Sequence, residues 1–128
     1  MSEKFTFEII SPDRTILKIE TNEVVIPAFE GEIGILKDHV SLITFLRPGL
    51  IKIKENSENS YFVENGTVEF SNNNLLILTS TAKELSKLDK NIVEKMIKEA
   101  EAKVENEDYS DKDRYLQSHK ISTLKSIN

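Results

Sequence analysis

Residues suited to chemistry are sparse in this chain. The two histidines, His39 and His119, lie far apart in the sequence, so their spacing does not predict a local metal-binding or catalytic pair. The chain has no cysteine, which excludes a thiolate nucleophile, a disulfide framework and a cysteine-type metal site. The sequence also lacks the phosphate-binding, serine-hydrolase and dinucleotide-binding motifs. We therefore predict no catalytic residue, no metal site and no cofactor.

Glu30 and Glu32, with Gly31 between them, are the candidate pair for acid–base chemistry. In an extended segment both carboxylates would point to the same side, and nothing nearby would separate their pKa values. A solvated acidic loop is therefore the simpler interpretation. His39 is likewise interpreted as a packing or loop residue, so the polypeptide acting alone is not expected to be an enzyme.

The elements that would position these residues change character at about Ser86. Before that point the sequence has short β-rich runs, and the period-two alternation is clearest in Phe5–Ile9. The other runs are Ile16–Glu20, Glu23–Ile26, Leu42–Leu46, Leu50–Lys54, Tyr61–Glu64, Thr67–Phe70 and Leu75–Ser80. Many short strands at this spacing predict a sandwich or a barrel.

Turn signals separate many of these runs. Ser11-Pro12-Asp13 favours a turn with proline at its second position, and Pro48-Gly49 suits a type II turn. Asn65-Gly66 has the residues that a type I′ hairpin needs, so the runs on either side of it are expected to pair. Glu55–Ser60 and Ser71–Asn74 are expected to be polar loop tips.

After Ser86 the chain has no glycine or proline, and its apolar period becomes helical. Ser86 with Asp89 offers a capping box for a first helix, and Ser110 with Asp113 could cap a second. The expected apolar positions are Leu85, Leu88, Ile92, Met96, Ala100 and Val104 in the first helix, and Tyr115, Leu116, Ile121, Leu124 and Ile127 in the second. The short polar break between the helices predicts an antiparallel hairpin.

The composition is that of an ordinary soluble protein. The chain is 38% apolar and 30% charged with a net charge of −5, which argues against binding to nucleic acid through its phosphates. No apolar run reaches the length of a membrane-spanning helix, and the N-terminus has no signal pattern. We predict an α+β protein with an N-terminal antiparallel β-sandwich domain at residues 1–86 and a C-terminal two-helix antiparallel hairpin at residues 87–128.

The segment from Pro27 to Gly49 carries the most specific motifs. It contains Glu30-Gly31-Glu32-Ile33-Gly34-Ile35, then His39, Leu42-Ile43-Thr44 and Pro48-Gly49. In this order and spacing it resembles the ε subunit of bacterial F-type ATP synthases. Phe7-Glu8-Ile9-Ile10-Ser11-Pro12, Tyr61-Phe62-Val63-Glu64-Asn65-Gly66 and Leu78-Thr79-Ser80-Thr81-Ala82 are also similar to motifs of that family. The resemblance covers essentially the whole chain.

The resemblance implies a non-catalytic rotor subunit of the central stalk. Such a subunit links the γ subunit to the ring of c subunits and couples proton translocation to ATP synthesis, while the α and β subunits carry the ATP chemistry. The implied location is peripheral, at the cytoplasmic face of the bacterial inner membrane. By resemblance, Glu30, Gly31, Glu32 and His39 contact the c-ring. An exposed apolar patch of the sandwich is expected to bind γ.

Leu88, Asp89, Ile92 and Val93 align with a motif at the start of the first helix that binds ATP in some relatives. Those relatives have arginine and alanine where this chain has Ile92 and Val93, and isoleucine cannot donate hydrogen bonds to a phosphate. Asp89 is therefore interpreted as a helix-start residue, and weak or absent nucleotide binding is expected. A nucleotide-sensing variant of the same subunit is the alternative.

Three basic residues, Arg114, Lys120 and Lys125, follow the acidic start of the second helix. By resemblance, the helices can extend along γ and restrain ATP hydrolysis, with this basic face directed at the α/β head. Complementing the helix dipole is the other explanation for the charges. From a different class, the alternative for the whole chain is an unrelated ligand-binding β-sandwich with a helical tail.

Overall fold

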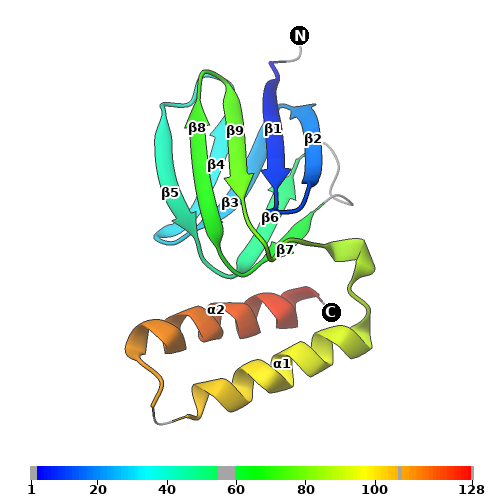
Figure 1. Ribbon diagram of the computed structural model, residues 1–128, viewed down its shortest axis with the longest axis vertical. Helices are drawn as coiled ribbons and strands as arrows, with labels where there is room; N and C mark the ends of the chain where they lie inside the picture. The colour runs from blue at the N-terminus through cyan, green and yellow to red at the C-terminus, as the bar shows by residue number, and fades with distance from the viewer. Residues whose placement is uncertain (1–2, 55–59, 107, 128) are drawn as a thin grey trace.

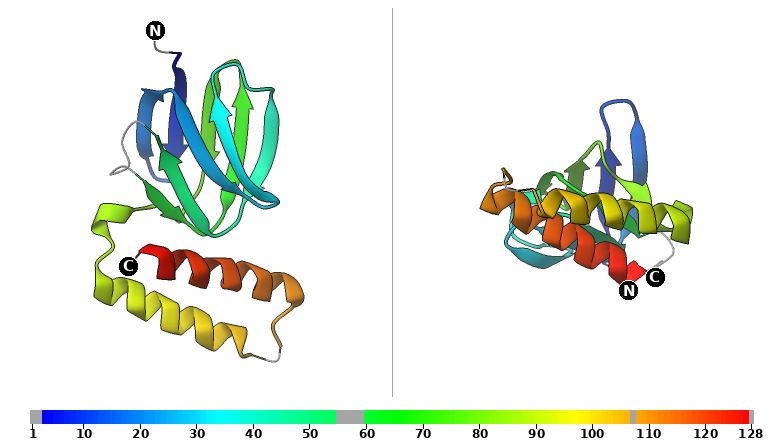
Figure 2. Two further views of the ribbon diagram at one scale, coloured as in Figure 1. Left: turned by 180° about the vertical axis from the view of Figure 1, so that it is seen from behind. Right: turned by 90° about the horizontal axis from the view of Figure 1, so that it is seen from below.

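The computed structural model describes residues 3–54, 60–106 and 108–127, which form a β-sandwich with two helices packed against one end (Figure 1). The helices run antiparallel, and α2 (Asp111–Ile127) lies nearer to the sandwich than α1 (Lys90–Val104) over most of its length (Figures 1 and 2). The predicted fold class, a sandwich followed by a helical hairpin, is confirmed.

The sandwich has ten strands in the described part of the chain. They are β1 (Phe5–Ile10), β2 (Thr15–Thr21), β3 (Glu23–Ala28), β4 (Gly31–Leu36), β5 (Leu42–Leu46), β6 (Gly49–Ile53), β7 (Tyr61–Val63), β8 (Gly66–Ser71), β9 (Asn74–Leu78) and β10 (Lys83–Glu84). One layer has the order β4-β3-β6-β7-β10 and the other the order β5-β8-β9-β1-β2, and the two are joined where Ala28 of β3 pairs with Leu46 of β5. The pairings are antiparallel except that of β1 with β9, which is parallel.

The main core lies between the two layers and follows the period-two pattern of the strands. In β1, Phe5, Phe7 and Ile9 point inward and are buried, and they meet Leu75 and Ile77 of the neighbouring β9. Burying a side chain of this size contributes about 1.5–3 kcal/mol. The sandwich therefore has a core of its own, distinct from the apolar contact with the helices.

The first helix starts three residues later than the expected capping box implies. Asp89 is the N-cap of α1, and its carboxylate accepts a hydrogen bond from the backbone N–H of Ile92 at 2.8 Å. Ser86 instead lies in a short 3₁₀ helix, Leu85–Lys87, so its predicted capping role is wrong. At α2, Ser110 Oγ accepts from the backbone N–H of Asp113 at 3.1 Å, as predicted.

The buried stripe of α1 agrees with the predicted one at Met96 and Ala100 and differs from it at Ile92. Val93 is fully buried, whereas Ile92, assigned to the stripe from the sequence, is 42% exposed. Met96, Ile97 and the buried Ala100 continue the stripe. Periodicity alone could not distinguish Ile92 from Val93, because both are apolar and adjacent.

Asn65-Gly66 does not form the predicted hairpin. β7 pairs with β6 and β10, whereas β8 pairs with β5 and β9, so the chain crosses between layers at this point. Gly66 has φ +151°, and a Cβ there would lie 2.7 Å from the backbone oxygen of Leu78. Glycine is needed for this close crossing. The adjacent positive φ values expected of a type I′ turn occur instead at Asn72 and Asn73, between β8 and β9.

Two other local expectations are also wrong. Gly49 does not have the positive φ that a type II turn requires; it is glycine because a Cβ there would meet Pro27 Cβ at 2.5 Å. The expected acidic loop is largely strand, because Gly31 and Glu32 begin β4, which pairs with β3 along its length. Of the expected loop Glu55–Ser60, residues 55–59 lie outside the described part of the chain.

Candidate functional site

The hairpin docks on the sandwich through a small apolar cluster centred on β7. Phe62, Val93 and Leu124 come from β7, α1 and α2 respectively, and all three are fully buried. Leu50 and Met96 are among the partly buried side chains that pack around them. One aromatic ring of the sandwich thus contacts both helices, and this contact holds the hairpin in its docked position.

Polar contacts from α2 to the sandwich lie beside this cluster. Tyr115 donates its hydroxyl to the backbone oxygen of Phe29 at 2.9 Å, and the two rings are 5.4 Å apart. One helical turn further on, His119 Nδ1 lies 3.1 Å from Arg47 Nη1. Burial and the Arg47 charge lower the pKa of His119 below its ordinary value.

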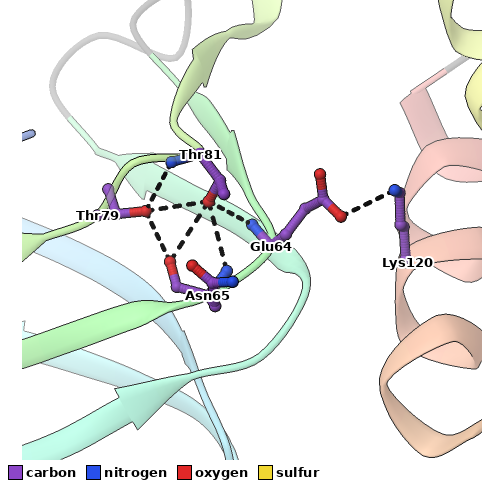
Figure 3. A network of polar contacts seen from close by, with 5 residues as sticks. All are labelled: Glu64, Asn65, Thr79, Thr81 and Lys120. Carbon is purple, nitrogen blue, oxygen red and sulfur yellow. Dashed lines mark hydrogen bonds and ion pairs between the residues drawn. The ribbon is translucent and has the colours of Figure 1, made fainter. Parts of the chain in front are cut away.

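A short charged contact between the two parts joins Lys120 to Glu64 at 2.8 Å (Figure 3). Only 11% of the Lys120 side chain is exposed, against 30% for Glu64. The backbone N–H of Glu64 donates to Thr81 Oγ1 at 3.0 Å, and Thr79 Oγ1 donates to the backbone oxygen of Asn65 at 2.7 Å. These side-chain hydrogen bonds fix the backbone that presents the carboxylate to Lys120.

The three basic residues of α2 do not form one basic face in the docked hairpin. Lys120 faces the sandwich, whereas Lys125 pairs with Glu101 of α1 at 3.6 Å. Arg114 donates to the backbone oxygens of Val104 at 3.4 Å and Asn106 at 3.1 Å, near the end of α1. Arg114 and Lys125 therefore stabilise the hairpin itself, and Lys120 helps to dock it.

The residues of the degenerate nucleotide motif have separate positions at the start of α1. Asp89 caps the helix, Val93 is buried against Phe62, and Leu88 is partly buried beside them. Ile92 lines a cavity of about 390 Å³ that is shared with Arg14, Tyr61, Lys83, Glu84 and others. An apolar side chain therefore occupies the position where the family motif has its arginine.

The residues expected at the c-ring contact lie along β4 and at both of its ends. Glu30 is in the turn before β4, and Gly31 and Glu32 are its first residues, near the hairpin end of the sandwich. His39 follows the far end of β4, where its ring lies 5.9 Å from that of Phe70. The exposed Glu32 pairs with Lys52 at 3.7 Å. The structure does not bring His39 together with the acidic pair.

An exposed apolar row crosses the outer surface of the second layer, at positions that the sequence prediction did not name. Ile43 and Phe45 of β5 are 78% and 62% exposed, and Leu78 of β9 is 46% exposed. Phe45 pairs with Thr67 of β8, which in turn pairs with Leu78, so the row spans three adjacent strands. The signal was present in β5, where apolar residues occupy both faces of the strand. Such a row is typical of a protein-binding surface.

Chemistry of other kinds has little support in the described residues. No group of three histidine, cysteine, aspartate or glutamate side chains is placed to hold a metal ion among them. No helix within the same part of the chain is long and apolar enough to cross a membrane.

Comparisons with known proteins identify the class to which this sandwich belongs. The family model of the delta/epsilon chain β-sandwich domain of ATP synthase matches residues 4–85. Over its full length the chain is 48% identical to the ATP synthase epsilon chain of Pelagibacter ubique, with all of both chains covered. It is 34% identical to that of Sinorhizobium medicae over 82% of this chain and 80% of the relative. The chain belongs to the ATP synthase epsilon chain family.

Solved structures show the same fold. A chain in the cryo-EM structure of the mitochondrial ATP synthase of Euglena gracilis superposes with a TM-score of 0.78 at 21% identity, covering 98% of this chain and 82% of that one. A chain of the Tetrahymena thermophila enzyme gives a TM-score of 0.60 at 13% identity, covering 98% and 95%. Both matches include the hairpin as well as the sandwich.

Proposed function

We propose that this chain is a non-catalytic rotor subunit in the central stalk of a bacterial F-type ATP synthase. It links the γ subunit to the c-ring and so couples proton translocation to ATP synthesis, while the catalytic head carries the ATP chemistry. The observation that carries this proposal is the 48% identity to an ATP synthase epsilon chain over the whole of both chains. The subunit is peripheral to the membrane, at its cytoplasmic face.

The outer apolar row of Ile43, Phe45 and Leu78 is the proposed γ-binding surface. These side chains are exposed on a rigid, hydrogen-bonded layer, so they are available without rearrangement of the sandwich. Docking against another apolar surface would remove them from water, which is the dominant favourable term in most protein association. The row therefore supports binding to a protein partner in the stalk.

The edge formed by β4 and its flanking turns is the proposed c-ring contact. Glu30, Gly31 and Glu32 lie at one end of this edge and His39 at the other. In the described pairings β4 bonds to β3 alone, so its other side is a strand edge available to a neighbour. The four residues support an extended contact along the edge, with two separate ends.

The hairpin is the proposed regulatory part, in which Arg114, Lys120 and Lys125 act on ATP hydrolysis when the helices leave the sandwich. Release breaks the Lys120–Glu64 pair, which frees that lysine for the acidic surface of the α/β head. Attraction of this kind fades with salt because exposed charges are screened. We therefore expect at most modest inhibition of hydrolysis, and less at high ionic strength.

Binding to γ tests the proposal directly. The chain should copurify with the γ subunit of the same organism, and the double variant Ile43→Ser, Phe45→Ser should lose most of that binding while its circular dichroism is unchanged. Lys18→Ser with Glu20→Ser is the control, because both positions are exposed on β2 away from the row. Failure of the unmodified chain to bind γ would overturn the assignment. Equal binding of γ by both double variants would show that γ contacts a different surface of the sandwich.

A further inference from the structure

The contact between His119 and Arg47 fixes the protonation state of this histidine in the docked hairpin. A guanidinium has donors and no acceptor, so His119 Nδ1 must accept the hydrogen bond at 3.1 Å. The imidazole is therefore neutral, with its proton on Nε2. Arg47 Nε is buried and has no partner among the described residues, which shows how little water reaches this side of the guanidinium.

Protonation of His119 would break this contact and reverse its electrostatics. An imidazolium has a hydrogen on both nitrogens, so Nδ1 could no longer accept from Arg47. Two cations would then face each other at the boundary between helix and sandwich. Turning the ring away is restricted, because Tyr115 packs against it with ring centroids 4.5 Å apart and is itself bonded to Phe29.

The other charged groups at this boundary do not supply a counter-ion for protonated His119. On the sandwich side these groups are Arg47 and Glu64, and Glu64 is already engaged by Lys120 at 2.8 Å. On α2 itself the titratable neighbour is Tyr115, and Lys112 lies over the ring of Phe29. Of the charges, Arg47 is the one that acts on His119. The balance of charge therefore opposes protonation in the docked state.

We infer that His119 and Arg47 form a pH-sensitive latch that holds the helical hairpin on the sandwich when His119 is neutral and weakens that docking when His119 takes up a proton. The inference concerns the isolated chain and stands independently of the proposed function. The Lys120–Glu64 pair and the Phe62 cluster hold the same interface, so acid loosens docking without abolishing it.

The direction of the pH effect follows from proton linkage. The pKa of His119 is lowered in the docked state and returns toward about 6.5 when the hairpin is released. The released state therefore binds more protons, so His119 contributes fully to docking above about pH 6.5, and this contribution is progressively lost as the pH falls below that value. Because His119 takes up a single proton, lowering the pH from 7.5 to 5.5 can raise the ratio of released to docked hairpin by at most about tenfold.

Thiol labelling can measure this release even when the released form is rare. The chain has no cysteine, so Val93→Cys places a single thiol on α1 at a position that is fully buried against Phe62 of the sandwich when the hairpin is docked. Its labelling rate in the full chain, divided by that of an unfolded peptide at the same pH, gives the opening constant. Ile77→Cys, in the sandwich core, reports global unfolding in the same way.

Three further variants on the Val93→Cys background decide the question. We expect the opening constant to rise several-fold from pH 7.5 to 5.5. Labelling at Ile77→Cys should stay slower than labelling at Val93→Cys at both pH values. His119→Gln keeps an uncharged acceptor for Arg47 and should remove the rise, and His119→Ala should open more at both pH values without the rise. His39→Gln is the control, because His39 lies at the far end of the sandwich, and it should keep the rise. A flat profile, a fall at low pH, or a rise that survives in His119→Gln overturns the latch.

Discussion

At the scale of single residues, Asp89 determines where the first helix begins. Its carboxylate accepts the Ile92 N–H at 2.8 Å and satisfies one of the free donors of the first turn. Asp89→Ala should lower the free energy of unfolding of the hairpin by about 1 kcal/mol, measured by thermal melting followed at a helical wavelength. Asp89→Asn keeps an equivalent cap and should be near neutral. Equal loss in both variants would point to the charge rather than to the hydrogen bond.

Ile92 is the residue on which the expectation of weak or absent nucleotide binding rests. Its side chain lines the cavity beside Tyr61 and has no donor for a phosphate. ATP at 1 mM should therefore shift the melting temperature by no more than about two degrees. A dissociation constant near 10 μM would add about 2.7 kcal/mol at that concentration and would be obvious in a melt. Such a shift would show that Arg14, Lys83 or other neighbours replace the missing arginine.

The sequence predicted the role of a residue correctly where its interaction partner is close in the chain, and it failed where the partner is distant. Ser110 was identified as a cap because its partner, Asp113, is three residues away. The ion pair of Lys120 with Glu64 and the contact of His119 with Arg47 could not be predicted, because they join segments that are distant in the chain. The outer apolar row is an intermediate case, because β5 shows apolar residues on both faces in the sequence, whereas the alignment of Phe45 with Leu78 across β8 depends on strand pairing.

At the scale of elements, α2 is held to the sandwich partly by a charge that is almost completely covered. Hydrogen bonds to charged groups contribute about 1.5–3 kcal/mol, and Lys120→Met would leave Glu64 without this partner. We expect the variant to increase the opening constant at Val93→Cys at every pH. Lys125→Met removes a contact between α1 and α2 and serves as the comparison, with a much smaller effect on docking.

A double-variant cycle separates the ion pair from simple packing. Glu64→Gln with Lys120→Met removes both charges, so the combined effect should be smaller than the sum of the two single effects. Purely additive effects would mean that the ion pair between Lys120 and Glu64 contributes nothing to the free energy of docking.

The sequence predicted the boundaries of the strands more accurately than it predicted which strands pair. Most strands were located to within a residue or two. β4 was missed because its two glycines, Gly31 and Gly34, are atypical of strands, and the two-residue β10 was missed as well. The Asn65-Gly66 hairpin was wrong because two runs that are adjacent in sequence enter opposite layers. Turn chemistry specifies a local backbone shape, whereas strand pairing depends on the whole sheet.

At the scale of the whole molecule, two apolar clusters support a division into a sandwich and a hairpin near Ser86. Among the residues that the structure describes, none of the interlayer core is helical, and the helices reach the sandwich through the separate cluster around Phe62. Residues 1–86 alone should therefore fold cooperatively and still bind γ, as measured by melting and by copurification. Phe62 would become exposed in this fragment, so Phe62→Ser should improve its solubility.

Two outcomes would contradict this division. An unfolded fragment would show that the hairpin is part of the folding unit, and a folded fragment that fails to bind γ would place that contact on the helices. The Ile43→Ser, Phe45→Ser variant of the full chain checks the second outcome. If the helices carry the γ contact, this variant should still bind γ.

The short connection between β10 and α1 has a kinetic consequence. Only the 3₁₀ turn Leu85–Lys87 and the residues Leu88 and Asp89 separate the sandwich from the helix. A tether this short keeps a released hairpin at an effective concentration in the millimolar range, so recapture is intramolecular. A detached peptide of residues 87–128 supplied at micromolar concentration would therefore compete poorly for the vacated surface. A partner that keeps the hairpin released must bind it before it redocks. The lifetime of the complex between that partner and the hairpin then determines how long the sandwich surface stays exposed.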